Sequence, residues 1–168
     1  MAIFNIDNLH TVLFADDRDS ADVTKQLLLQ AGVSHPRHLR DIDEAFDICF
    51  RMTIDILLID MDSSSDSGKQ LIRKLRAAAI EQEFNTRILA LIGTKEEEAV
   101  LSVASCGVDS IMMKPIAPDA MKKRLVKIHE MEVNYLKFDG YYGPDRRIMP
   151  DRLPAGEIDK RSIDEDVT

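Results

Sequence analysis

The sequence predicts an α/β fold in which a doubly wound parallel sheet is covered by helices on both faces. Short, continuously apolar segments alternate along the chain with segments whose apolar residues recur at helical spacing. The apolar segments lack the polar–apolar alternation of a half-exposed strand, which indicates strands buried on both sides. Hydrophobic residues make up 45% and charged residues 31% of the 168 positions, a balance typical of globular proteins.

Five strands are expected, and each is followed by a helix. The segment IDILLI is the strongest strand signal because it is apolar almost throughout and ends at Asp60. The segment TVLFA likewise ends at an acidic pair, and the last strand is stopped by Lys114-Pro115. The second strand has the weakest signal in the sequence. The strands are expected at 11–15, 37–42, 54–59, 87–92 and 110–113.

The helices are predicted from apolar spacing and from the residues at their ends. Gly32 and Gly107 each follow a helical segment, where a left-handed residue commonly closes a helix. Pro118 suits a first helical turn, because the backbone N–H that proline lacks would be unpaired there. The helices are expected at 20–31, 44–52, 69–79 and 95–106, and from Pro118 onward.

Charge and targeting signals narrow the classes of function. Thirty acidic and 22 basic side chains give a net charge of −8, which argues against direct DNA binding because phosphates require a basic face. Apolar runs fall short of the roughly 20 residues that a membrane span requires, and the sequence starts without an export signal. Cys49 and Cys106 lie in apolar segments without a CxxC motif, which favours buried thiols. We therefore expect a cytoplasmic protein.

Polar residues follow three of the predicted strands: Asp16 and Asp17, then Asp60 and Asp62, then Lys114. Ligands of doubly wound folds bind at the carboxyl ends of the strands. Carboxylates gathered there would repel one another unless a cation lay among them, and magnesium prefers such oxygens. A carboxylate can also act as a nucleophile that forms an aspartyl phosphate. Each aspartate taken singly is more often a helix cap or turn residue, and each lysine a surface residue, so their joint occurrence is the signal.

The chain resembles the response-regulator receiver (CheY-like) family of bacterial two-component signalling over residues 10–129. The resemblance rests on the acidic pair in VLFADD, on DILLIDMD with Gly68 eight residues after Asp60, and on CGVDSIMMKP. It implies a flavodoxin-like (βα)5 sheet with strand order 2-1-3-4-5. It also implies a signalling module rather than an enzyme.

The resemblance implies a role for each polar residue at the strand ends. Asp60 would accept a phosphoryl group from a histidine kinase or phosphotransfer protein, and Lys114 would contact that group. A magnesium ion would be bound by the carboxylates of Asp17 and Asp60, by a water on Asp16 and by the backbone carbonyl of Asp62. The peptide bond before Pro115 would be cis, which is inexpensive only before proline.

Two positions depart from the family pattern. Ile92 stands where receivers carry a Ser or Thr at the end of the fourth strand, and Ile111 replaces an aromatic residue on the fifth. Thr94 could replace the hydroxyl only after a loop rearrangement, and Ser63-Ser64-Ser65 lacks the proline common in that loop. We therefore expect magnesium binding and phosphoryl acceptance with an atypical conformational switch. The alternative is a pseudo-receiver that acts as a phosphorylation-independent adaptor.

A class of enzymes also shares part of this acidic pattern. Asp60-Met61-Asp62 also resembles the DxD motif of the haloacid-dehalogenase phosphohydrolases. In those enzymes the motif lies on the first strand and the other acidic pair comes late, whereas here the order is reversed. A phosphatase assay on a generic aryl phosphate would discriminate between the two classes.

Residues 130–168 form an extension beyond the receiver domain at 10–129. The final helix is predicted to continue past residue 130, with a stripe formed by Met131, Tyr135 and Phe138. This stripe would either pack on its own domain or form a homodimerisation or docking surface. The extension is too short for a DNA-binding output domain, so we expect output through contact with a downstream protein.

The residues from Asp139 onward contain a GPDRR motif similar to tails of some bacterial receiver-like proteins. Arg146 and Arg147, beside Tyr141 and Tyr142, could bind a carboxylate, a phosphate or a nucleotide. The favoured interpretation is an unstructured, irregular tail with an acidic end.

Overall fold

The computed structural model describes residues 4–62, 66–138 and 141–145 of the chain. Five parallel strands form one sheet in the order β2-β1-β3-β4-β5, which confirms the predicted doubly wound fold and strand order. The strands are β1 (Thr11–Phe14), β2 (Arg37–Leu39), β3 (Ile56–Asp60), β4 (Arg87–Ile92) and β5 (Ser110–Met113). The helices are α1 (Arg18–Gln30), α2 (Ile42–Arg51), α3 (Ser67–Ala78), α4 (Glu97–Ser105) and α5 (Pro118–Glu130). A short 3-10 turn, η1 (Ile6–Asn8), precedes β1.

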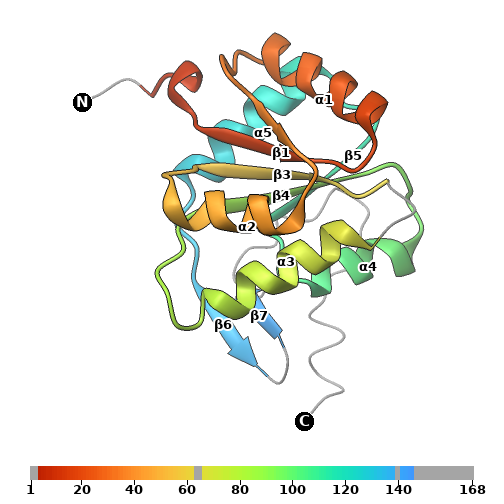
Figure 1. Ribbon diagram of the computed structural model, residues 1–168. Helices are drawn as coiled ribbons and strands as arrows, with labels where there is room; N and C mark the ends of the chain where they lie inside the picture. Colours follow the sequence, from red (N-terminus) through yellow and green to blue (C-terminus); the bar gives the residue numbers. More distant parts are fainter. Residues whose placement is uncertain (1–3, 63–65, 139–140, 146–168) are drawn as a thin grey trace.

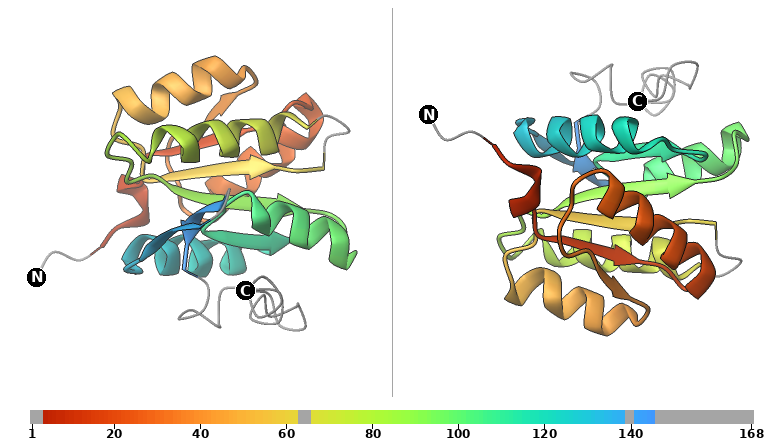
Figure 2. Two further views of the ribbon diagram at one scale, coloured as in Figure 1. Left: turned by 90° about the horizontal axis from the view of Figure 1, so that it is seen from below. Right: turned by 90° about the horizontal axis from the view of Figure 1, so that it is seen from above.

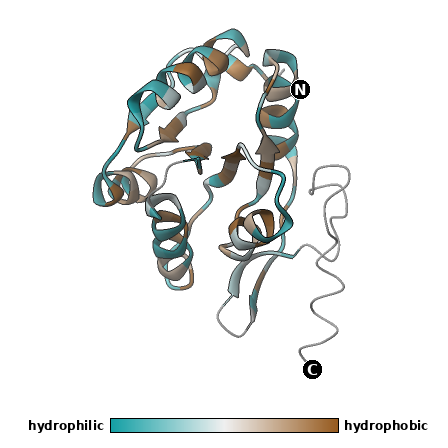
Figure 3. Cartoon of the chain, turned by 90° about the vertical axis from the view of Figure 1, so that its right-hand side faces the viewer, coloured by the Kyte–Doolittle hydropathy of each residue, from teal (hydrophilic) through white to brown (hydrophobic). Residues whose placement is uncertain are grey.

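The core has two layers because successive residues of each strand face opposite sides of the sheet. Leu57 and Ile59 of β3 pack in the cluster formed with α2, α3 and α4, whereas Leu58 packs in the cluster with α1 and α5. Figures 1 and 2 show α1 and α5 on one face and the other three helices on the opposite face. Hydrophobic colouring is concentrated on the strands in Figure 3. The continuous apolar runs of the sequence are therefore explained by burial on both faces.

The predicted helix ends are confirmed. Gly32 and Gly107 have positive φ angles of 104° and 97°, as left-handed residues that close α1 and α4 should. Pro118 lies in the first turn of α5. Asp17 caps α1, since its carboxylate accepts a hydrogen bond from the backbone N–H of Ser20 at 2.8 Å.

The prediction that α5 extends beyond residue 130 is wrong. The helix ends at Glu130, and the chain then forms an antiparallel hairpin of β6 (Tyr135–Phe138) and β7 (Tyr141–Pro144), beside α3 in Figure 1. Val133, Tyr135 and Phe138, in and just before β6, are residue types that favour strands. Ser63-Ser64-Ser65, Arg146 and Arg147 lie outside the described residues.

The hairpin is joined to the domain by a buried polar cluster at the amino-terminal edge of the sheet. The Asp109 carboxylate accepts hydrogen bonds from Arg76 Nη2 at 3.0 Å, from the Ile88 backbone N–H at 2.7 Å and from the Tyr135 hydroxyl at 2.8 Å. The Tyr135 hydroxyl in turn accepts from Arg87 Nη1 at 2.9 Å. In β6 the Tyr135 hydroxyl thus supplies one of the donors that the buried Asp109 carboxylate requires.

None of the helices in the described part of the chain combines the length and the apolar character needed to cross a membrane.

Candidate functional site

Asp60 lies at the carboxyl end of β3 and is the centre of a polar cluster. Its side chain is 3% exposed. Lys114, which follows β5, places its ammonium 2.9 Å from both carboxylate oxygens of Asp60. The hydroxyl of Ser20 donates to Oδ2, and the backbone N–H of Asp62 donates to Oδ1 at 3.0 Å. The carboxylate therefore accepts hydrogen bonds from α1, from the segment after β3 and from the segment after β5.

The electrostatics of the cluster keep both central groups charged. Burial raises the pKa of Asp60, but hydrogen bonds from Ser20, Lys114 and Asp62, together with the charge of Lys114, outweigh it and lower the pKa below its usual value. Burial lowers the pKa of Lys114, and its hydrogen bonds to Asp62 and Asp60 reverse that effect and raise it. The site thus holds an ionised carboxylate in contact with a protonated amine.

Asp62 binds the same lysine and reaches the next strand. Its Oδ2 accepts from Lys114 Nζ at 2.6 Å, and its Oδ1 accepts from the backbone N–H of Gly93 at 2.5 Å. Gly93 directly follows Ile92, the last residue of β4. The sequence predicted Asp62 as a ligand through its backbone carbonyl only, so the role of this carboxylate was missed.

The two acidic residues after β1 have different partners. The Asp17 carboxylate caps α1, as the general preference for caps suggested, and the Asp16 carboxylate accepts a hydrogen bond from the Ser67 hydroxyl in α3. Ser20 connects the pair to the centre of the site, because its N–H bonds Asp17 and its hydroxyl bonds Asp60. The sequence analysis missed Ser20 and Ser67; the signal for Ser20 was its position three residues after a capping aspartate.

The arrangement of the acids is compatible with a cation that uses few protein ligands. No group of three or more His, Cys, Asp or Glu side chains is placed to hold a metal ion by itself in residues 4–62, 66–138 and 141–145. Magnesium commonly takes one or two carboxylates and keeps several waters, so Asp17 and Asp60 have suitable donor chemistry. The predicted magnesium ligands remain a prediction.

A groove of about 870 Å³ opens beside Asp60, between α1 and the segment after β5. Ser20 and Lys114 line it together with the apolar side chains of Val23, Leu27 and Ile116. Val23 is 72% exposed and contributes apolar surface to the groove. The groove provides an apolar surface that reaches the polar cluster.

The two departures from the receiver pattern are both core residues. Ile92 is 3% exposed and Ile111 is fully buried, and both pack in the cluster with α2, α3 and α4. Thr94 accepts a hydrogen bond from the Glu96 backbone N–H at 3.2 Å within its own loop. The Lys114-Pro115 peptide bond is cis, as the resemblance implied.

Comparisons with known proteins point to the receiver family that the sequence resembles. The sequence profile of the response regulator receiver domain matches residues 12–126. The cell cycle transcriptional regulator CtrA of Caulobacter vibrioides is 28% identical over 118 residues, which cover 70% of this chain and 48% of CtrA. The chemotaxis protein CheY of Pseudomonas aeruginosa is 23% identical over 120 residues, 71% of this chain and 95% of that protein. The alignment thus spans about half the length of CtrA.

The solved structures show the same fold. A response regulator from Thermotoga maritima superposes with a TM-score of 0.58 at 22% identity, covering 73% of this chain and 99% of that one. The matched region lies within the predicted domain at 10–129 and contains the whole polar cluster at the end of β3. The chain therefore belongs to the response regulator receiver domain family, with its acidic residues and its lysine at the carboxyl edge of the sheet.

Proposed function

We propose that the chain accepts a phosphoryl group on Asp60 in a magnesium-dependent reaction. The observation that carries the proposal is the contact of both Asp60 oxygens with Lys114 Nζ at 2.9 Å, at the carboxyl edge of a receiver sheet. The phosphoryl donor would be a histidine kinase or a phosphotransfer protein, as expected for this family.

In this reaction Asp60 is the nucleophile. Its lowered pKa leaves the carboxylate ionised at neutral pH, so that an oxygen lone pair is available. With a phosphohistidine donor, the O–P bond to Asp60 forms as the N–P bond breaks, and the imidazole keeps the electron pair of the broken bond. Lys114 already contacts both oxygens and would offset the negative charge of the transferred group.

Magnesium would be held by the carboxylates of Asp17 and Asp60, through a water on Asp16 and by the backbone carbonyl of Asp62. Hard carboxylate oxygens suit this ion, and the proposal is supported by the two hydrogen bonds that join Ser20 to the Asp17 and Asp60 carboxylates. When bound, magnesium supplies positive charge that stabilises the phosphoryl oxygens.

The conformational response to phosphorylation would differ from that of receivers with a Ser or Thr at the end of the fourth strand and an aromatic residue on the fifth. Ile92 cannot donate a hydrogen bond to a phosphoryl oxygen, and Ile111 is packed in the core rather than free to change position. Such apolar residues favour a single packed state. We therefore infer that phosphorylation changes the surface at the site more than it moves β5.

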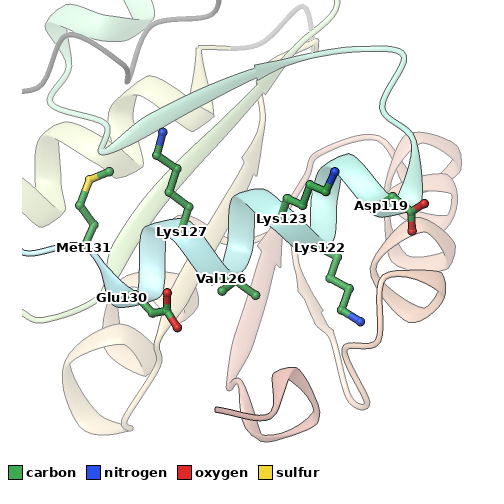
Figure 4. A pocket seen from close by; sticks show the side chains of 7 residues that line it. All are labelled: Asp119, Lys122, Lys123, Val126, Lys127, Glu130 and Met131. Atoms are coloured by element: carbon green, nitrogen blue, oxygen red, sulfur yellow. The ribbon is translucent and has the colours of Figure 1, made fainter. Parts of the chain in front are cut away.

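Partners would bind at two surfaces. The groove beside α1 offers the kinase or phosphotransfer protein an apolar contact that leads to Asp60. A depression of about 620 Å³ lies along α5, and its lining, shown in Figure 4, contains three lysines and two acids: Lys122, Lys123, Lys127, Asp119 and Glu130. These lysines favour an acidic downstream protein.

A homodimer through the final helix is less favoured than it was from the sequence. Its basis was a helical stripe containing Tyr135, whose hydroxyl instead bonds Asp109. Two copies facing each other through α5 would also bring their lysines together. Light scattering after size-exclusion chromatography, at several protein concentrations, tests whether the chain dimerises. A dimer fraction that grows with concentration would support the homodimer.

The direct test of the proposed function is covalent labelling of Asp60. Wild-type protein incubated with acetyl phosphate and magnesium should gain one phosphoryl group, detected by intact mass. Asp60→Asn, which keeps the size of the side chain, should not gain it, and removal of magnesium by a chelator should abolish the gain. An unlabelled wild-type protein would contradict the proposal.

A phosphorylation-independent adaptor is the second candidate. It is favoured by the Asp62 carboxylate, which already accepts hydrogen bonds from Gly93 N–H and Lys114 Nζ in the unmodified protein. In that case the wild type would stay unlabelled, and Asp60→Asn would bind downstream partners as well as the wild type does.

A further inference from the structure

The carboxylate of Asp62 is held between donors that follow two different strands. Gly93, after β4, donates its N–H at 2.5 Å, and Lys114, after β5, donates from Nζ at 2.6 Å. The Asp62 side chain is 36% exposed, so these donors rather than burial fix its position. The fit is close, because a Cβ added to Gly93 would lie 2.9 Å from both carboxylate oxygens.

The Lys114 ammonium is shared between Asp62 and Asp60. A phosphoryl group on Asp60 would bring up to two negative charges and three acceptor oxygens to the same ammonium. Those oxygens would compete for Lys114, which already bonds Asp62, and Asp62 in turn holds the Gly93 N–H. The negative phosphoryl group and the Asp62 carboxylate would repel each other strongly, because both would contact the same ammonium in a partly buried site. The Asp62 carboxylate and the phosphoryl group therefore cannot both keep these donors.

We propose that Asp62 is a resident anion that occupies the phosphoryl-binding donors of the unmodified protein and is displaced when Asp60 is phosphorylated. This inference rests on the phosphoryl-acceptor function proposed above. It gives the loop after β4 a connection to the site that requires no hydroxyl at position 92, because the Gly93 N–H is joined to Lys114 through Asp62. The loop is thus held before phosphorylation, and acquisition of the phosphoryl group is opposed by Asp62.

The occupancy of the donors is tested without any ligand. Amide hydrogen exchange of Gly93, followed by NMR, should accelerate by roughly tenfold or more in Asp62→Ala, because the amide loses a charged acceptor. Asp47→Asn is the control of charge, since Asp47 lies exposed on α2 and does not line the groove beside α1. It should leave the exchange of Gly93 unchanged. Unchanged exchange in Asp62→Ala would overturn the inference.

The competition is tested with beryllofluoride and magnesium as the phosphoryl analogue. Asp62→Asn should bind the analogue roughly tenfold more tightly than the wild type, whereas Asp47→Asn should bind it as the wild type does. Equal or weaker binding by Asp62→Asn would overturn the inference. If neither the wild type nor Asp62→Asn binds the analogue, the phosphoryl-acceptor function itself is wrong. The exchange of Gly93 then decides alone whether Asp62 holds the donors.

Discussion

The hydroxyl of Tyr135 provides a specific test of how the C-terminal hairpin is attached to the domain. It donates to Asp109 Oδ1 at 2.8 Å and accepts from Arg87 Nη1 at 2.9 Å. Tyr135→Phe removes the hydroxyl and keeps the ring, which lies 4.9 Å from the Arg76 guanidinium. The variant therefore isolates the hydrogen bonds of the hydroxyl from the packing of the ring.

The magnitude follows from the burial of the acceptor. The Asp109 side chain is 0% exposed, so the oxygen that loses its donor cannot be hydrated instead. Hydrogen bonds to charged groups contribute about 1.5–3 kcal/mol, and we expect the free energy of unfolding to fall by that amount. For a protein of this size the melting temperature should fall by roughly 3–12 °C. Urea unfolding followed by circular dichroism, together with calorimetry, measures both quantities.

Tyr142→Phe is the matched control, because it makes the same chemical change on the adjacent strand. Its ring stacks on Tyr135 with centroids 6.0 Å apart, a contact that phenylalanine retains. We expect this variant to change the free energy of unfolding by less than about 0.5 kcal/mol. Equal effects of the two substitutions, or a loss below about 0.5 kcal/mol for Tyr135→Phe, would refute the anchoring role of the hydroxyl.

Three further perturbations test the core and the site. Arg76→Met leaves the buried Asp109 carboxylate without its cation and should cost about 3–5 kcal/mol in urea unfolding, whereas a smaller loss than that of Tyr135→Phe would contradict the pairing. Because folding lowers the pKa of Asp60, its ionised form stabilises the protein above the ordinary value of 3.8, and this contribution is lost as the pH falls through the lower folded pKa. The difference in unfolding free energy between wild type and Asp60→Asn should therefore change between about pH 6 and about pH 2, and a constant difference would be inconsistent with a lowered pKa. Ile92→Thr should destabilise the core by about 1–3 kcal/mol and enlarge the beryllofluoride-induced NMR shifts in α4 and β5; shifts equal to those of the wild type would count against the atypical readout.

Local sequence patterns were sufficient for the elements of the domain and for the residues at their ends. Periodicity separates the strand IDILLI from the helices around it, and a glycine after a helix reflects a local backbone requirement that Gly32 and Gly107 meet. Strand-favouring residue types at Val133, Tyr135 and Phe138 were also a local signal for β6, but the apolar spacing of Met131, Tyr135 and Phe138 was interpreted with the helical period.

The sequence by itself thus determined that acids and a lysine would gather at the carboxyl edge of a parallel sheet. Only the tertiary structure decided how they are paired. Lys114 and Asp62 are 52 residues apart in the chain, and Asp62 and Gly93 are 31 apart. Hydrogen bonds form over about 3 Å, so their partners depend on how the strands and loops are packed. For that reason the structure, and not the sequence, revealed that Asp62 shares the lysine with Asp60 and connects it to the loop after β4.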